Sequence, residues 1–185
     1  MKEFLLKLLK AILKKLAKLT LGRFRPGIIG ITGSVGKTST KSVLAAVLKN
    51  DRHLRASFGN FNNEIGLPLT ILGDWEKIEG ITFWPKVVFS SFLKLLTPLN
   101  WMKKKYPELL VLEYAADKPG DIRDLLSVAR PNISVITAIG AIPVHIENYS
   151  GPEEIGREKS RLIEYLPSAG LAVLNYDAEA VMALK

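Results

Sequence analysis

The sequence predicts an α/β fold of the phosphate-loop type: a mostly parallel sheet with helices on both faces, preceded by an N-terminal amphipathic helix. Three observations predict it. Short apolar runs alternate with helical stretches, a glycine-rich turn joins the first run to a helix, and the first 25 residues differ in composition from the rest. Continuously apolar strands separated by helices are typical of a parallel sheet that is buried on both faces.

Composition limits the classes of protein to consider. The chain has 185 residues, 48% of them hydrophobic, which is enough for one buried core with an appendage. It contains no cysteine, which excludes disulfides and thiolate metal sites and fits a cytoplasmic location. The first 25 residues hold eight basic residues and one acidic residue, so +7 of the net charge of +8 lies there. The remainder is nearly neutral, and we expect no nucleic-acid partner.

Residues 1–25 are predicted to form a basic amphipathic helix and a linker. At helical spacing one face is apolar and the opposite face is basic. The apolar face holds Leu5, Leu8, Leu9, Ile12, Leu13, Leu16 and Leu19, and the basic face holds Lys7, Lys10, Lys14 and Lys18. The segment is too rich in lysine to span a bilayer and lacks the cleavage site of a signal peptide. Two interpretations stay open: the helix lies on an anionic membrane surface, or it docks its leucines on protein.

Residues 26–185 are predicted to form one domain that is incomplete, because the chain reaches its last residue within a helical pattern that has no stop signal. The expected strands are 27–31, 54–58, 109–115, 133–139 and 171–175, and the expected helices are 37–48, 64–72, 121–129 and 151–166. An aromatic-rich insertion at 74–106 interrupts this alternation.

The stretch "GIIGITGSVGKTST", residues 27–40, resembles a phosphate-binding loop without its first glycine. The usual pattern is G-x-x-x-x-G-K-[ST], and Ile31 stands where that glycine belongs. Strand, glycine-rich turn, Lys-Thr pair and helix nevertheless occur in the expected order. Backbone N–H groups at such a helix start bind anions, Lys37 can reach terminal phosphates, and the Thr38 hydroxyl can ligate Mg²⁺. The predicted nucleotide-binding residues are Gly33, Ser34, Val35, Gly36, Lys37, Thr38 and Ser39.

Glu113 and Lys159 are candidates for metal chemistry. Glu113 ends the run "LLVLE", and ligands bind at the carboxyl ends of parallel strands. Mg²⁺ needs few protein carboxylates because it shares the phosphates of a nucleotide. Lys159 shares an apolar helix face with Ile155 and Leu162, in a helix that begins at a capping box formed by Ser150 and Glu153. Such a lysine either extends to the rim or has a lowered pKa and acts as a nucleophile.

The histidines are assigned differently. His53 lies in the polar turn "NDRHLR" and is interpreted as a surface residue. His145 follows the fourth predicted strand, at the sheet edge that also carries Glu113. A lone histidine is usually structural, so the sequence pattern by itself leaves the role of His145 open.

Five ordered motifs resemble the Mur ligases, ATP-dependent enzymes that build the peptide of bacterial cell-wall precursors. Among these enzymes the similarity is greatest to the branch that adds D-alanyl-D-alanine. The motifs are "TGSVGKTSTK" at 32–41, "GNFNNEIGLPLTIL" at 59–72, "VLEYAADKPGDI" at 111–122, "HIENYSGPEEIGREKSRLI" at 145–163 and "GLAVLNYD" at 170–177.

The resemblance implies an ATP-dependent ligase of peptidoglycan synthesis that forms an amide bond through an acyl phosphate. The carboxylate would belong to a UDP-N-acetylmuramoyl peptide and the amine to D-alanyl-D-alanine. We expect ATP and two Mg²⁺ ions, and we expect the 185-residue chain alone not to complete the reaction. The residues that match metal ligands are Thr38, Glu113, His145 and a carbamoylated Lys159, those that match catalytic residues are Lys37, Lys159 and His145, and those on the substrate side are Asn62 and Asn63.

The segment before His145 departs from the family pattern. Two extra residues lie between Gly140 and His145, and Ala138 stands where an asparagine is expected. The geometry of that loop is therefore expected to differ from the family's.

Two other function classes stay open. Residues 117–120, "DKPG", match the D-x-x-G motif of a phosphate-loop GTPase or ATPase switch, but no base-reading N-K-x-D motif occurs. The other alternative is an inactive membrane-surface scaffold. Within the insertion, Pro85 and Pro98 bracket a short predicted helix, and aromatic residues lie beside the lysines at 103–105. We expect residues 1–21 and 83–105 to form one apolar, basic surface that either packs internally or contacts the cytoplasmic membrane.

Overall fold

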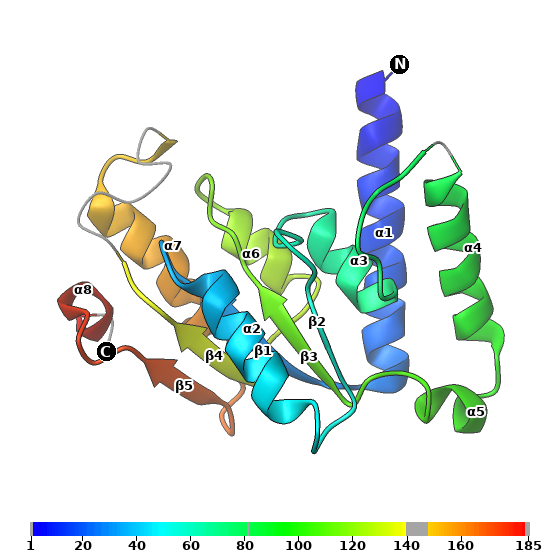
Figure 1. Cartoon of the computed structure of the whole chain (residues 1–185). Coiled ribbons are helices and arrows are strands. Elements are labelled where there is room, and N and C mark those ends of the chain that lie inside the picture. Colours follow the sequence, from blue (N-terminus) through cyan, green and yellow to red (C-terminus); the bar gives the residue numbers. More distant parts are fainter. Residues whose placement is uncertain (1, 81, 140–147, 184–185) are drawn as a thin grey trace.

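A computed structural model describes residues 2–80, 82–139 and 148–183. Its centre is a sheet in which the strands are ordered β2-β3-β1-β4-β5 and every neighbouring pair is parallel. The strands are β1 (Gly27–Thr32), β2 (Leu54–Ala56), β3 (Leu109–Glu113), β4 (Ile133–Ile136) and β5 (Leu171–Leu174). The predicted parallel α/β fold is therefore confirmed (Figure 1).

Strands β3 and β4 end earlier than the apolar runs predict, because the backbone beyond them bonds to loops. After Glu113, the Tyr114 N–H still donates to the Ile31 carbonyl, but the Ala115 N–H donates to the Asn62 carbonyl at 2.9 Å. A hydrophobic run shows which residues are buried and does not show where strand pairing stops.

Helices cover the two faces of the sheet unequally. The helices are α1 (Lys2–Phe24), α2 (Lys37–Leu48), α3 (Gly66–Leu72), α4 (Phe83–Leu96), α5 (Leu99–Lys103), α6 (Asp121–Leu126), α7 (Pro152–Glu164) and α8 (Glu179–Met182). Side chains of α1, α3, α6 and α7 pack with Ile28, Leu110 and Leu112 on one face. On the other face, α2 packs over Ile31 and Val111. This division follows from the alternation of side chains along a strand.

The edge strand β5 is poorly covered. Leu171 is 57% exposed and Val173 is 44% exposed, whereas the central strands β1 and β3 are almost wholly buried. Apolar strand residues normally lie beneath a helix in a parallel sheet, so the exposure of Leu171 and Val173 is unusual for this fold.

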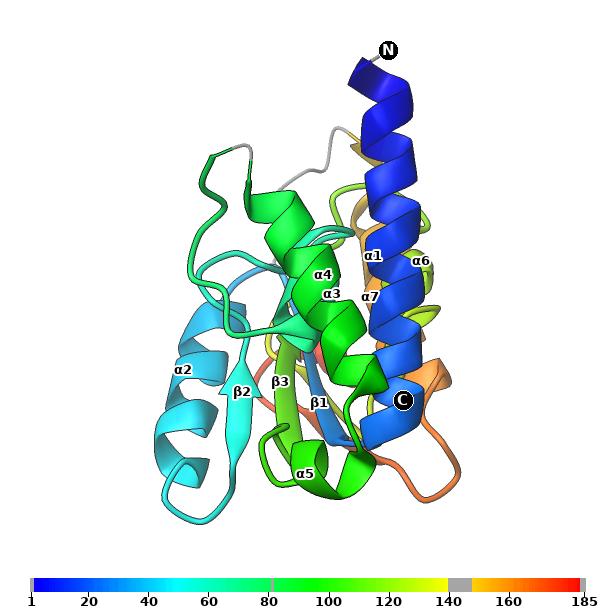
Figure 2. The ribbon, with the colours of Figure 1, turned by 90° about the vertical axis from the view of Figure 1, so that its right-hand side faces the viewer.

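Helix α1 lies along the domain and extends beyond it at its N-terminal end (Figures 1 and 2). Its buried residues are Leu13, Leu16, Ala17, Thr20 and Phe24, and it contacts α3 and α4. The predicted apolar face is thus divided: Leu13 and Leu16 are buried, whereas Leu5, Leu8, Ile12 and Leu19 are at least 36% exposed. The contact of α1 with α3 and α4 thus covers only part of the predicted apolar face.

Helix α4 begins before the expected boundary at Pro85. It starts at Phe83, so that Pro85 lies in its first turn. Proline is tolerated in a first turn because the missing N–H would have no partner there. Phe83 and Val87 are buried against α1 and α3, in a cluster with Leu13, Leu69 and Leu72.

Candidate functional site

The glycine-rich loop lies between β1 and α2, and its first glycine is absent for a structural reason. Ile31 is fully buried and lies within β1, in register with Glu113 of β3 and Val135 of β4. It belongs to the sheet, and the loop starts after it. Gly33 cannot be replaced, because its φ is +151° and an added Cβ would lie 2.0 Å from the Thr137 Oγ1.

The end of β4 supports the loop. The Ser34 N–H donates to the Ala138 carbonyl at 2.7 Å. The Thr137 hydroxyl donates to the Val35 carbonyl at 2.6 Å, and its oxygen lies 3.3 Å from the Thr32 carbonyl oxygen. Thr137 was not predicted from the sequence, because a hydroxyl residue just beyond a strand carries no distinctive signal.

Helix α2 presents its N-terminus beside the loop. Gly36, with φ of +85°, precedes Lys37, and the first turn contains no acidic residue and no side-chain cap. Thr38 and Ser39 are exposed there, and Val35 is 61% exposed. The unpaired N–H groups and the positive end of the helix dipole favour an anion at this position.

Lys37 lies folded over the loop. Its Nζ donates to the Gly33 carbonyl at 2.8 Å. Burial lowers the pKa of Lys37, and the carboxylates of Glu113 and Asp117 partly offset that effect. Its ammonium therefore lies in the field of two carboxylates, at the place where an anion would be bound.

Glu113 is buried at the end of β3, and its partner is a residue that sequence reasoning missed. Glu113 is 1% exposed and Lys41 is 4% exposed. The Lys41 Nζ lies 2.8 Å from the Glu113 Oε1 and also donates to the Gly59 carbonyl at 2.7 Å. One signal was present: Lys41 follows Lys37 by four residues, so both lie on the same face of α2.

The two predicted substrate-side asparagines have different environments. The Asn62 Nδ2 lies 3.5 Å from the Glu113 Oε2, and Asn62 lines the same cavity as Lys37. The Asn63 Oδ1 instead accepts hydrogen bonds from the N–H groups of Ile65 and Gly66, at 3.1 and 3.0 Å. Asn63 therefore caps the start of α3.

Lys159 is buried on α7, as its place in the apolar stripe predicts. It is 4% exposed, and Ile155 and Leu162 on the same face are fully buried. Its pKa is lowered to about 8, mainly by burial and then by the nearby Lys37, while Asp117 and Glu158 act in the opposite direction. A lysine with this pKa has a substantial neutral fraction near pH 8, and the neutral amine is the nucleophilic form.

The start of α7 differs by one residue from the predicted capping box. Glu154, not Glu153, accepts hydrogen bonds from Ser150, with 2.7 Å to its N–H and 2.9 Å to its Oγ. The helix begins at Pro152 after Gly151, so the reciprocal carboxylate lies one position further along.

A cavity of about 150 Å³ brings several of these groups together. It is lined by Gly33, Ser34, Lys37, Asn62, Ala115, Ala116, Asp117 and Lys159. The Ser34 Oγ is buried and has no hydrogen-bond partner in the described part of the chain. The glycine loop of β1, the segment after β3 and the middle of α7 thus meet around one small polar space. Glu113 is outside this lining, although its charge acts on Lys37.

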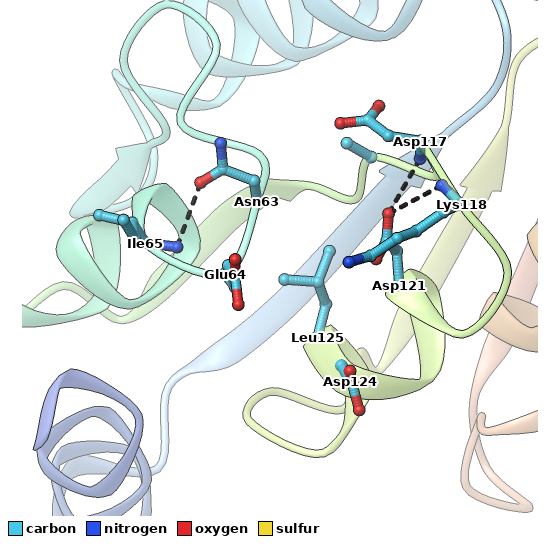
Figure 3. A pocket seen from close by; sticks show the side chains of 9 residues that line it. Asn63, Glu64, Ile65, Asp117, Lys118, Asp121, Asp124 and Leu125 are labelled. Atoms are coloured by element: carbon cyan, nitrogen blue, oxygen red, sulfur yellow. Dashed lines mark hydrogen bonds between the residues drawn. The ribbon is translucent and has the colours of Figure 1, made fainter. Parts of the chain in front are cut away.

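A second cavity, of about 340 Å³, adjoins the first and shares Ala115 and Asp117 with it (Figure 3). Figure 3 shows the Asp121 carboxylate turned towards the backbone of Asp117 and Lys118. Both N–H groups donate to the Asp121 Oδ2, at 3.1 and 3.0 Å. Gly120 has a φ of +94° and precedes α6. The "DKPG" segment is therefore a turn that leads into a helix, which accounts for its residues without a switch function.

His145 lies outside the described residues, so its predicted role stays a prediction.

The donor set fits Mg²⁺. Glu113 offers a buried carboxylate, whose Oε1 is paired with the Lys41 ammonium in this structure. Thr38 offers an exposed hydroxyl near the helix start. Mg²⁺ prefers oxygen ligands, keeps several waters and uses few protein carboxylates. Across residues 2–80, 82–139 and 148–183, no group of three metal-binding side chains occurs. A site that relies on nucleotide phosphates for further ligands agrees with this.

The fold and the loop define the class first. A parallel sheet carries, at the carboxyl end of its central strand, a glycine turn, a lysine and a helix N-terminus, which is the arrangement of a phosphate-loop α/β protein.

The chain belongs to the Mur ligase family: the Mur ligase middle domain matches residues 31–82 and 89–185. The Mycobacterium leprae UDP-N-acetylmuramoyl-tripeptide–D-alanyl-D-alanine ligase is 33% identical over 177 residues. That match covers 94% of this chain and 28% of the M. leprae ligase. The Bacillus subtilis ligase of the same name is 32% identical over 161 residues, with 87% and 28% covered.

Solved structures agree with the family. The MurF ligase of Thermotoga maritima, in complex with ADP, has a TM-score of 0.72 and 33% identity. The match covers 94% of this chain and 34% of that one. MurF of Acinetobacter baumannii, at 21% identity and a TM-score of 0.70, supports the fold. The chain thus spans about a third or less of the relatives it matches.

Proposed function

We propose that this chain is the ATP- and Mg²⁺-binding part of a ligase that adds D-alanyl-D-alanine to a UDP-N-acetylmuramoyl tripeptide in the cytoplasm. The observation that carries the proposal is the cavity that joins the phosphate loop to Lys159 and Asn62. Family membership and the ligases named above supply the reaction class.

The proposed reaction has two steps. A carboxylate oxygen of the tripeptide attacks the γ-phosphorus of ATP, and the bond to the β,γ-bridging oxygen breaks, which gives an acyl phosphate and ADP. The amine of D-alanyl-D-alanine then attacks the acyl carbon, phosphate leaves, and the amine loses a proton. Both reactants of the first step are anions, so cationic groups lower its barrier.

The residues of this chain have distinct proposed roles. The backbone from Gly33 to Ser39 binds the phosphates, and the Lys37 ammonium leaves the Gly33 carbonyl to contact the terminal phosphates. Thr38 and Glu113 would hold Mg²⁺. A bound Mg²⁺ neutralises charge on the phosphoryl oxygens. Asn62 orients the substrate near the loop.

Lys159 is proposed to react with CO₂ as a neutral amine and to become a carbamate. The ammonium first loses a proton, the nitrogen of the neutral amine then bonds to the carbon of CO₂, and a second proton is released from that nitrogen. The product is an anionic carbamate that would hold a second Mg²⁺ together with His145. The lowered pKa, about 8, supports this step because only the neutral amine reacts. Nuclear magnetic resonance with ¹³C-labelled bicarbonate tests it. A carbamate signal that is absent in Lys159→Met is expected, and the same spectrum for both proteins contradicts it.

Substitution of Lys37 tests the phosphate site. In a ligase that carries these residues, Lys37→Ala should cost about 3–4 kcal/mol of transition-state stabilisation, because a preorganised charge is lost. Phosphate release and formation of the ligated peptide are the measurements. In the 185-residue chain, calorimetry should show binding of ATP in preference to GTP, and this binding should weaken in Lys37→Ala.

Lys49→Ala is the matched control, since Lys49 directly follows the same helix and is exposed. It should behave as the wild type. Full ligase activity in a folded Lys37→Ala protein would refute the assignment of the phosphate loop.

A further inference from the structure

Helix α4 packs inward through Phe83 and Val87 together with polar residues, and its outer side is also apolar. Ser91 is 1% exposed, and its hydroxyl donates to the Val87 carbonyl at 2.7 Å. The Lys94 ammonium reaches inward and donates to the Leu72 carbonyl at 2.6 Å. The outward residues, by contrast, are Phe89, Phe92, Leu93 and Leu96, at 64, 52, 46 and 65% exposure.

The outward apolar residues of α4 follow the helical period. Their spacing is i, i+3, i+4 and i+7, so they form one continuous stripe. A helix that docks by a single face shows such a stripe on the side that packs. The stripe on α4 faces away from its own domain, so the residues that pack on this domain leave it uncovered.

Helix α1 adds a second outward row beside it. Leu5, Leu8, Ile12 and Leu19 are 36–56% exposed, on the side of α1 that does not pack against the domain. The two helices lie next to each other (Figure 2). Between them is a mainly apolar groove of about 550 Å³, lined by Ile12, Lys15, Leu16, Leu19, Arg23, Phe92 and Leu95. We call the two exposed rows and this groove the α1–α4 surface.

Basic residues lie in the groove of this surface and in the segment that follows α4. Lys15 and Arg23 line the groove itself, and the exposed residues 103–105 of the neighbouring segment are all lysine. Trp101, on α5, is 71% exposed beside those lysines. Residues 80–107 contain no acidic residue. Apolar and aromatic side chains next to a lysine cluster are characteristic of helices that lie in the headgroup region of a membrane.

We propose that the α1–α4 surface docks onto an anionic lipid bilayer, with α1 and α4 lying in the plane of the interface. The positive charge of the surface favours an anionic bilayer as its occupant. A protein partner would have to present an acidic face that matches this surface. No helix in the described part of the chain is long and apolar enough to cross a membrane, so the contact is peripheral. The proposal goes beyond the ligase function and does not depend on it.

Vesicle flotation tests the proposal on the full chain. Vesicles of phosphatidylcholine with phosphatidylglycerol are compared with vesicles of phosphatidylcholine alone. The chain should float with the anionic vesicles, float less with the neutral ones, and dissociate as the salt concentration rises, because attraction of lysines to lipid is screened. Fluorescence should shift to shorter wavelength as Trp101 enters the interface, and a Trp101→Phe variant should lack most of that shift.

A matched pair of double variants distinguishes binding through this surface from non-specific hydrophobic binding to vesicles. The double variant Phe89→Gln, Phe92→Gln should lower the partition coefficient by about tenfold or more, since two aromatic side chains that enter the bilayer interface are lost. Val43→Gln with Val47→Gln is the control, because these valines are 62% and 64% exposed on α2. The control should partition as the wild type does, and thermal melting should show that both variants fold.

Three outcomes would overturn the proposal. The first is no binding of the wild type to anionic vesicles at low salt. The second is equal binding by both double variants. The third is a dimer in light scattering that separates in the Phe89→Gln, Phe92→Gln variant while vesicle binding is absent, which would assign the surface to a second copy of the chain.

Discussion

The phosphate site and the α1–α4 surface depart in opposite directions from the usual distribution of polar and apolar residues. Around the phosphate loop, charged side chains are inside: Lys41, Glu113 and Lys159 are each less than 5% exposed. On α1 and α4, large apolar side chains are outside, as Phe89 and Leu96 illustrate.

The two departures have different costs. A buried charge loses hydration and needs a partner or a shifted pKa. An exposed phenylalanine costs the folded chain little, but it is a liability for aggregation unless something covers it. The buried charges of the site therefore lower the folding free energy that is available to the domain. The exposed apolar side chains of the surface have little effect on that free energy but favour association with other molecules. Substitutions in the site should therefore change the free energy of unfolding more than substitutions on the α1–α4 surface do.

The largest effect is expected from breaking the buried ion pair. Lys41→Met leaves the Glu113 carboxylate buried without its cation, and should lower the free energy of unfolding by about 3–5 kcal/mol. Urea denaturation without nucleotide or metal measures it. The double variant Lys41→Met, Glu113→Gln should recover much of the loss, because neither charge remains.

The exposed pair of Lys7 and Glu3 is the matched control. Lys7→Met should leave the unfolding midpoint unchanged, since exposed pairs contribute little. The coupling is contradicted if the loss of stability in the double variant equals the sum of the losses in Lys41→Met and Glu113→Gln.

Two leucines of α1 test the boundary between the docked and the outward side. Leu13 is fully buried and Leu19 is 51% exposed on the same helix. Leu13→Ala should cost about 2–4 kcal/mol, because it removes contacts and leaves a cavity. Leu19→Ala should cost less than about 1 kcal/mol in the same denaturation experiment. Equal losses would show that the outer row is covered in solution.

Lys159→Met should have the opposite sign, a gain in stability. The folded pKa, about 8, lies below the usual 10.5, so the unfolded chain binds the proton more tightly. This cost is fully present below pH 8 and disappears as pH rises towards 10.5. At pH 7, in buffer free of CO₂, the variant should therefore be more stable than the wild type by about 3 kcal/mol.

The gain should shrink between pH 8 and 10.5, and Lys159→Arg, which keeps the charge, should show no gain. A variant that is less stable than the wild type at pH 7 would contradict the cost assigned to burial of the Lys159 ammonium. Denaturation over a pH series makes the measurement.

Much of the fold could be predicted because it depends on local periodicity. Alternating apolar runs and helical stretches indicated the parallel sheet and the order of its elements. The ends of β3 and β4 were predicted too late. Beyond β3 the Ala115 N–H donates to the Asn62 carbonyl in a loop, and beyond β4 the Ala138 carbonyl accepts from the Ser34 N–H of the glycine-rich loop. Those bonds join residues distant in sequence, and no local pattern reveals them.

The candidate site divides in the same way. The sequence by itself determined the phosphate loop, the candidacy of Glu113 at a strand end, and the unusual position of Lys159 in an apolar stripe. Only the tertiary structure decided that Lys41 pairs with Glu113, that Thr137 supports the loop, and that a second apolar row of α4 faces outward. The physical reason is that periodicity and motif spacing report what one segment can do. Which groups meet, and which face remains uncovered, depends on how separate segments pack against one another.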